Sequence, residues 1–129
     1  MLHNCLDSYL KKVESYLIML NNVYIEHYLE EILTPNRANL RIRIRWNTGH
    51  LLIINKAIII KDDRLDFLDY RYHFQNEDNN LIFRYDSTPH FPALPTFPHH
   101  KHLPNEVIAC EMPDLIQVIN EAVSICQIV

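Results

Sequence analysis

The first twenty residues carry the pattern of an amphipathic helix. Their apolar positions recur at steps of three and four, while Lys11, Lys12 and Glu14 fall on the other side. These apolar positions are Leu2, Leu6, Tyr9, Leu10, Val13, Leu17 and Leu20. Near the C-terminus a second helix is predicted, with Pro113 in its first turn. Its apolar side is formed by Leu115, Ile119, Ala122 and Cys126.

Between these helices the apolar period changes to two, which predicts strands. In residues 23–33 the spacing of Ile25, Leu29 and Ile32 fits a helix, whereas the Tyr- and Ile-rich composition fits a strand, and we favour the strand. Residues 39–46 alternate apolar side chains with arginines. A turn at 47–50, where Gly49 supplies a positive φ, leads into the apolar run 51–60, which we expect to be buried on both faces for much of its length. Further strands are predicted at about 64–75, 81–86 and 106–111. The pattern therefore predicts a single α+β domain over residues 1–129. We expect an antiparallel meander sheet of five to six strands, with the N- and C-terminal helices packed on one face.

Composition narrows the functions that such a domain can have. The 129 residues include one glycine, whereas a P-loop needs at least two and a dinucleotide-binding fingerprint three. Cys5, Cys110 and Cys126 are widely spaced and form no CxxC pair, which argues against a thiolate zinc site or a disulfide framework. No signal pattern or apolar run of about 18 residues is found, so we expect a cytoplasmic protein that does not enter a membrane. The formal net charge of −4 confines any nucleic-acid binding to a local patch.

Residues 87–104 hold five of the seven prolines and four of the eight histidines. The prolines at positions 89, 92, 95 and 98 follow at steps of three, which is the repeat of a polyproline II helix. In that conformation Phe91, Leu94 and Phe97 form one edge that packs on the sheet. A straight segment of this kind would separate His90 from His99 by about 28 Å. His90 therefore joins the other histidines only if this ordered loop bends, and otherwise serves a different role, for example across a homodimer.

The densest chemical signal is the sequence His-His-Lys-His at residues 99–102. In extended backbone, His100 and His102 point to one side of the strand and their two neighbours to the other. Two imidazoles and an ammonium group can cleave an RNA phosphodiester without a metal. One imidazole removes the 2′-OH proton, the other protonates the leaving 5′-oxygen, and the cation stabilises the phosphorane. Two alternatives remain open: a divalent metal site at His100 and His102 completed by Asp86 or His90, and a solvated loop without chemistry.

Neighbouring strands carry further polar candidates. Arg71 and His73 alternate with aromatic residues on one strand, and Arg84 shares a face of the next strand with Asp86. A hairpin places these rows side by side, as either a cross-strand salt bridge or a phosphate site. A separate arginine stripe, about 13 Å long at strand spacing, matches two or three phosphates of a single strand and includes no acidic residue. This stripe consists of Arg41, Arg43 and Arg45.

The residues that carry these signals resemble the TumE family of toxins from bacterial and archaeal toxin–antitoxin pairs. The resemblance rests on Tyr70–Gln75, Leu81–Asp86, Pro89-His90, Thr96–His102 and the Pro-Asp-Leu sequence at residues 113–115. Two positions depart from the pattern. The turn at residues 77–80 contains no glycine, and Phe91 replaces a second histidine after His90. The positions that coincide with the motif are Tyr72, His73, Arg84, Asp86, His90, His99, His100, Lys101 and His102.

The resemblance implies a small toxin that acts on RNA and is neutralised by a helix-turn-helix antitoxin. Together with the residue chemistry, it leads us to expect a metal-independent endoribonuclease without a cofactor. His100 with His102 or His99 would act as acid and base, Lys101 with Arg84 would bind phosphate, and Asp86 would orient an imidazole. The expected substrate-binding residues are Arg71, Tyr72, His73, His90, Arg41, Arg43 and Arg45. The alternatives are a phosphodiesterase for small or cyclic oligonucleotides and a non-catalytic protein-interaction module.

Overall fold

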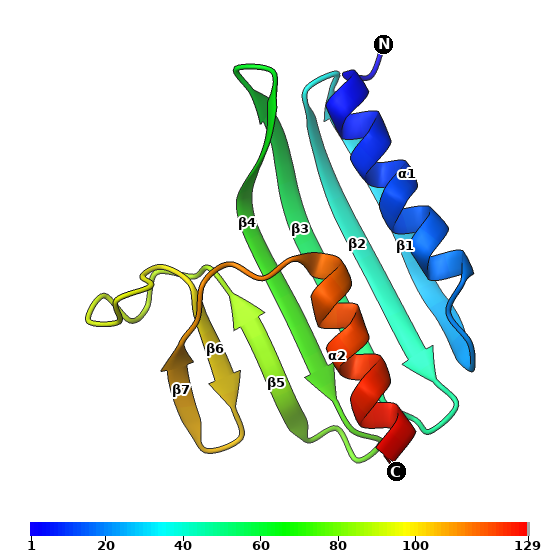
Figure 1. The fold of residues 1–129 in the computed structure, drawn as a ribbon, viewed down its shortest axis with the longest axis vertical. Helices are drawn as coiled ribbons and strands as arrows, with labels where there is room; N and C mark the ends of the chain where they lie inside the picture. The colour runs from blue at the N-terminus through cyan, green and yellow to red at the C-terminus, as the bar shows by residue number, and fades with distance from the viewer. Residues whose placement is uncertain (129) are drawn as a thin grey trace.

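The computed structural model describes residues 1–128, which form two helices and a seven-stranded antiparallel sheet (Figure 1). The elements are α1 (Asn4–Ile18), β1 (Val23–Thr34), β2 (Arg37–Trp46), β3 (Leu51–Lys61), β4 (Arg64–Gln75), β5 (Leu81–Asp86), β6 (His100–Leu103), β7 (Glu106–Ala109) and α2 (Leu115–Ile128). The strands follow one another in the sheet in chain order, and both helices cover the same face in Figure 1. The predicted α+β meander is therefore confirmed. In this described range, neither helix is long and apolar enough to cross a membrane.

The sheet has one strand more than the largest number expected. The additional strand is β6, which lies inside the segment that the sequence assigns to a loop. Its residues, His-Lys-His-Leu, show no strand-like apolar alternation. The strand forms because β5 and β7 pair with its two edges and satisfy its backbone groups. Pairing with β5 and β7 decides this element, and local propensity does not.

The two faces of the sheet differ in character. The helix face is the core: α1 contributes Leu6, Leu10, Val13 and Leu17, and the strands contribute residues such as Ile42, Ile54, Tyr72 and Phe83. Alternate residues of the same strands point to the opposite side, here called the open face. The expectation that residues 51–60 are buried on both faces is wrong, because both described helices lie on the other side. On the open face, Ile53 and Ile59 are only partly buried.

The helix ends agree with the predictions to within a few residues. α1 begins after His3, whose Nδ1 accepts a hydrogen bond from the Cys5 backbone N–H. α2 begins at Leu115, and the Val118 N–H donates to the Asp114 carbonyl in its first turn. Pro113 therefore lies two residues before the helix and not within its first turn, as the sequence suggested.

The β2–β3 hairpin depends on Gly49, which has a φ of +94°. A side chain at this position would be strained by that backbone conformation, and an added Cβ would lie 2.7 Å from Cβ of Glu77. We expect Gly49→Ala to lower the free energy of unfolding by more than about 1 kcal/mol. Urea unfolding of this variant measures the loss, and the exposed turn residue Asn47, replaced by alanine, is the control. Equal stability of Gly49→Ala and the wild type would contradict this account.

The proline-spaced segment between β5 and β6 is not a polyproline II helix. It folds as consecutive turns, in which Leu94 N–H donates to Phe91 O and Phe97 N–H donates to Leu94 O. Pro92 and Pro95 occupy the second position of these turns, where a fixed φ near −65° fits. The Phe97–Pro98 peptide bond is cis. The steps of three therefore specify a chain of turns, which bends the segment back toward the sheet.

Candidate functional site

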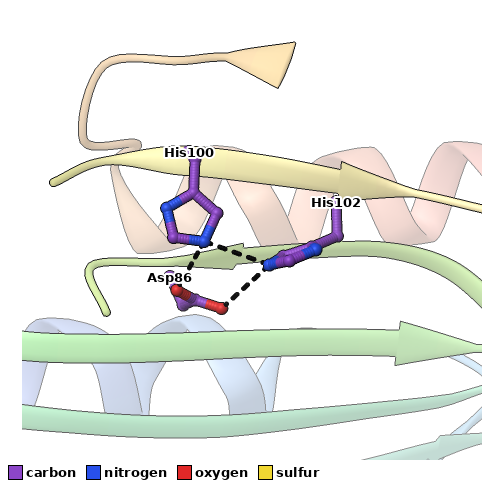
Figure 2. A group of neighbouring side chains, drawn as sticks. All are labelled: Asp86, His100 and His102. Carbon is purple, nitrogen blue, oxygen red and sulfur yellow. Dashed lines mark hydrogen bonds and ion pairs between the residues drawn. The ribbon is translucent and has the colours of Figure 1, made fainter. Parts of the chain in front are cut away.

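Asp86, His100 and His102 meet on the open face, where strands β5 and β6 pair (Figure 2). Nε2 of His100 lies 2.9 Å from Oδ1 of Asp86 and 3.0 Å from Nε2 of His102. Nε2 of His102 lies 3.5 Å from Oδ2 of Asp86. Two imidazole nitrogens and one carboxylate therefore face one another within a few ångströms. We call these three residues the Asp-His-His cluster.

Strand geometry explains why these residues converge. Asp86 stands directly opposite His100 in the antiparallel register, and His102 is two residues further along the same strand. The intervening residue, Lys101, points to the helix face, where its Nζ lies 2.9 Å from Oε2 of Glu121 on α2. The same carboxylate accepts a hydrogen bond from the Tyr85 hydroxyl. This contact holds β6 against the core from behind and fixes both imidazoles on the open face.

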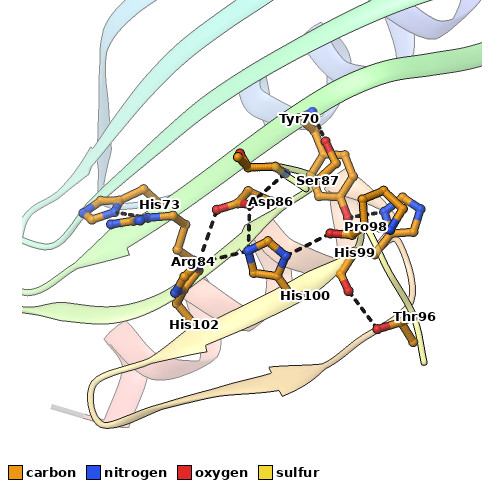
Figure 3. Close-up of polar contacts among 11 residues, drawn as sticks. Tyr70, His73, Arg84, Asp86, Ser87, Thr96, Pro98, His99, His100 and His102 are labelled. Atoms are coloured by element: carbon orange, nitrogen blue, oxygen red, sulfur yellow. Dashed lines mark hydrogen bonds and ion pairs between the residues drawn. The ribbon is translucent and has the colours of Figure 1, made fainter. Parts of the chain in front are cut away.

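Two backbone groups orient the cluster, and Figure 3 shows one of them, the Pro98 carbonyl, beside His100. Nδ1 of His100 lies 2.9 Å from the Pro98 carbonyl oxygen, and Oδ1 of Asp86 accepts from the Thr88 backbone N–H at 3.0 Å. A carbonyl oxygen only accepts, so Nδ1 of His100 carries a proton. Its Nε2 is therefore the atom available to the other two members of the cluster.

The three members of the cluster differ in how far they are exposed to solvent. The side chains of His100 and Asp86 are 1% and 5% exposed, whereas His102 is 21% exposed. Phe91 packs over both imidazoles, with ring centroids 5.0 Å from His100 and 5.9 Å from His102. Burial lowers the pKa of His102, Asp86 opposes this change, and His100 with the nearby Arg84 adds to it. The cluster is thus nearly dry and opens to solvent at His102.

A guanidinium group is held beside the cluster. Nε of Arg84 lies 3.3 Å from Nδ1 of His73, whose Nε2 lies 2.9 Å from the amide oxygen of Gln75. His73 therefore accepts from Arg84 and donates to Gln75, which requires the neutral ring. Burial lowers the pKa of His73, and Arg84 and Arg71 lower it further, in agreement with that protonation state. His73 and Gln75 act as positioning residues for the Arg84 guanidinium.

A cross-strand row connects the cluster to the arginine stripe. In the pairing register, Arg41 of β2 faces Asn55 of β3, which faces Arg71 of β4, which faces Asp86 of β5. At about 4.8 Å per strand, this row is about 14 Å long and runs across the strands. A shallow hollow in the open face includes Asn39, Arg41, Asn55, Asp69 and Arg71 in its lining.

The other two arginines of the stripe have an acidic partner. Nε of Arg45 lies 2.9 Å from one carboxylate oxygen of Glu26, and Nε of Arg43 lies 3.4 Å from the other. The acid comes from β1, which is why residues 41–45 alone gave no sign of it. Arg41 is therefore the member of the stripe aligned with Arg71 and the cluster.

Several predicted site residues lie elsewhere. Lys101 is on the helix face, as described. His99 stacks on Tyr70, with its Nδ1 2.9 Å from the tyrosine hydroxyl, and helps to fix the end of the turn segment. His90 is exposed on that segment. Tyr72 is buried in the core, and no described residue forms a hydrogen bond with its hydroxyl. The cluster retains Asp86, His100 and His102, with Arg71, Arg84 and His73 beside it.

Three further residues complete this site, and none of them was among its predicted members. Gln75 lies at alternate positions with Arg71 and His73 along β4, so the sequence pattern already placed its side chain on the same face of the sheet. Asn55 joins the row only through the pairing register, which the sequence does not reveal. Phe91 stood out as a departure from the family pattern, and the structure shows it covering the imidazoles.

These features define a small α+β protein whose open sheet face carries a cluster of His and Asp side chains beside arginines. The chain belongs to the toxin TumE family, whose model matches residues 13–128. It is therefore the toxin component of a toxin–antitoxin pair, and its family implies an antitoxin partner. No curated protein and no solved structure matches the chain.

Proposed function

We propose that this toxin cleaves phosphodiester bonds of RNA at the Asp-His-His cluster. The observation that carries the proposal is the placement of two imidazole nitrogens and one carboxylate beside Arg84 and Arg71 on an open sheet face. In a chain of net charge −4, this concentration of cations is local and selects an anionic group. A phosphate suits the fork geometry of arginine.

The proposed reaction is an in-line attack at phosphorus by the neighbouring 2′-oxygen. A P–O bond forms to this oxygen while its proton passes to the cluster, and the bond to the 5′-oxygen breaks. The leaving 5′-oxygen takes up a proton, and the products are a 2′,3′-cyclic phosphate and a 5′-hydroxyl end. Arg84 and Arg71 stabilise the negative charge of the phosphorane, which exceeds that of the bound phosphate.

The purified protein incubated with long single-stranded RNA tests this proposal. We expect fragments with 2′,3′-cyclic phosphate ends from the wild type and from His27→Ala, which removes an exposed imidazole on β1. We expect Arg84→Ala to cleave at least about 100-fold more slowly, because a stabilising charge-assisted contact is lost. Cleavage at an equal rate by Arg84→Ala would overturn the assignment of the site.

One observation favours a second candidate, a phosphodiesterase for small or cyclic oligonucleotides. Because Glu26 occupies Arg43 and Arg45, the accessible cationic row is short and extends only from Arg41 to the cluster. A short row suits a substrate of a few nucleotides. Cyclic oligoadenylates added to the same assay separate the candidates: preferential cleavage of these compounds over long RNA would favour the second. Cleavage of neither substrate would favour a non-catalytic module.

The cross-strand row predicts which arginines bind the nucleic acid. We expect Arg41→Ala and Arg71→Ala each to weaken binding to single-stranded RNA and to reduce the slope of log affinity against log salt by about 0.7. Arg43→Ala is the matched control, since Glu26 already neutralises that side chain and the expected change is small. Fluorescence anisotropy over a salt series measures both quantities. A larger loss of RNA affinity in Arg43→Ala than in Arg41→Ala would contradict the prediction that the cross-strand row binds RNA.

The partner is proposed to be a helix-turn-helix antitoxin, as the family resemblance implies. Affinity purification of the toxin co-expressed with the product of its neighbouring gene tests this assignment. A stable complex with a helix-turn-helix protein supports it, and a partner of another fold would refute it.

A cytoplasmic location and a homodimer stay predictions. Size-exclusion chromatography with light scattering tests whether the protein is a homodimer.

A further inference from the structure

We infer that the Asp-His-His cluster is a binding site for one divalent transition-metal ion. Two histidines and one carboxylate are a common ligand set for first-row metals. The three candidate ligand atoms are Nε2 of His100, Nε2 of His102 and a carboxylate oxygen of Asp86. This inference differs from the metal-independent reaction expected from the sequence, because a bound ion would occupy the lone pairs that take up the proton in the proposed cleavage. It depends on the geometry of the cluster alone.

The spacing of the ligand atoms fits an ion between them. With metal–ligand bonds of about 2.0–2.2 Å, neighbouring ligands of a tetrahedral ion lie about 3.3 Å apart. Here Nε2 of His100 lies 2.9 Å from Oδ1 of Asp86 and 3.0 Å from Nε2 of His102, while Nε2 of His102 lies 3.5 Å from the other carboxylate oxygen, Oδ2. One ligand atom from each residue lies within 4.8 Å of the other two. Rotation of the Asp86 carboxylate and the His102 ring about their side-chain torsions would bring one oxygen and both nitrogens to the spacing of a bound ion. The strands that carry the ligands need not move.

The hydrogen-bond inventory also favours an ion. His100 uses its Nδ1 proton on Pro98, so its Nε2 faces a carboxylate and a second imidazole nitrogen. Without a proton between them, three lone-pair donors point at one another in a nearly dry space. One shared proton can form hydrogen bonds with only some of these three groups, whereas one cation accepts all three lone pairs. The cluster is thus built for a positive charge at its centre.

The surroundings of the cluster match those of a metal site. A ligating imidazole normally donates its other N–H to a carbonyl or carboxylate, as His100 does to the Pro98 carbonyl oxygen. Asp86 is also held, by the Thr88 backbone N–H. Phe91 supplies an apolar cover, and His102 is the member of the cluster that reaches solvent. Three protein ligands with an open position are the arrangement of catalytic zinc ions.

Direct binding measurements on the purified protein test the inference without any RNA. Zn²⁺ is titrated in competition with a chromogenic chelator, and Co²⁺ is added in a parallel experiment to record its visible ligand-field absorption. We expect one ion per chain, and a Co²⁺ spectrum typical of mixed nitrogen and oxygen ligation. Mg²⁺ is expected to bind weakly, because it prefers oxygen ligands and retains its water.

Ligand variants then locate the ion. We expect His102→Ala and Asp86→Asn each to weaken Zn²⁺ binding by about 100-fold or more, since each removes or weakens one of three ligands. Even the loss of an outer-shell partner costs 10- to 100-fold. His27→Ala, which removes an exposed imidazole, should bind Zn²⁺ as tightly as the wild type. Thermal unfolding without metal verifies that each variant is folded.

The results of these experiments distinguish the metal site from the proposed RNA cleavage. One tightly bound ion that is lost in the ligand variants and retained in His27→Ala supports the site. Absence of stoichiometric Zn²⁺ and Co²⁺ binding to the wild type, or equal affinity in His102→Ala, overturns it. A metal-binding protein that cleaves no RNA would refute the proposed function and leave the metal site standing, while the reverse result would refute the metal site alone.

Discussion

Cells that express His102→Ala are expected to grow at the rate of cells without the toxin, while the wild type arrests growth. His102 is the most accessible member of the Asp-His-His cluster, so its loss removes chemistry with little damage to the core. Loss of a group that moves a proton or holds an ion lowers a rate by about 100-fold or more. Growth curves after induction, together with sequencing of RNA ends, measure this effect.

The choice of variant matters because His100 and Asp86 are buried together. Replacing His100 with alanine would leave the Asp86 carboxylate without its closest imidazole and would destabilise the fold by roughly 3–5 kcal/mol. Loss of toxicity in that variant would not distinguish unfolding from lost chemistry. His102→Ala avoids this problem, and His27→Ala controls for the removal of an imidazole. Full toxicity of His102→Ala, at equal protein level, would show that the cluster does not carry the activity.

Replacing Lys56 with methionine is expected to stabilise the protein at neutral and acidic pH. Lys56 lies on the helix face and is only 4% exposed. Its Nζ lies 2.6 Å from the Tyr9 hydroxyl and 3.6 Å from the centre of the Phe67 ring. Burial lowers the pKa of Lys56 from 10.5 to about 7, which the more distant Asp114 partly opposes. A buried ammonium without a close carboxylate costs free energy that methionine does not.

The pH dependence of this effect has a definite sign. Between the native pKa of about 7 and the unfolded value of 10.5, the unfolded chain binds one proton more than the native state at Lys56. The stability contributed by this group therefore rises with pH in that window and is lowest below pH 7. We expect Lys56→Met to gain about 2 kcal/mol at pH 6, after the loss of the contacts with Tyr9 and Phe67.

Urea unfolding at several pH values between 6 and 9 measures this prediction. The advantage of Lys56→Met over the wild type should shrink by up to about 1.4 kcal/mol per pH unit above pH 7.5. Comparing the two proteins cancels the contributions of cysteines and tyrosines that titrate in the same range. Lys61→Met, at the exposed end of the same strand, should show no such dependence. A constant difference between Lys56→Met and the wild type would mean that Lys56 does not titrate near neutral pH.

Much of the fold followed from periodicity. Apolar steps of three and four located both helices, and alternation located β2, β4 and β5, because burial of one face imposes these periods on any sequence. The same alternation placed His100 and His102 on one side of the chain and Lys101 on the other. Gly49 identified a hairpin turn. These features depend on residues within a few positions of one another.

The candidate site depended on contacts that periodicity does not encode. Lys101 was grouped with the histidines because it lies between them in sequence, yet it binds Glu121 on the opposite face. The threefold proline spacing fits both a polyproline II helix and consecutive turns, and the packing of Phe91 on the imidazoles accompanies the turns. Glu26, which occupies two of the three arginines of the stripe, belongs to another strand.

The sequence by itself therefore determined an α+β meander, one basic strand face and a histidine-rich segment with the residues for phosphate or metal chemistry. Tertiary structure alone decided that β6 exists, that Asp86 stands opposite His100, and that Arg41 and Arg71 form one row across the sheet. The physical reason is that side-chain periodicity records only whether a residue faces the core. The pairing register between strands, which brings distant residues within bonding distance, is set by the packing of the whole sheet.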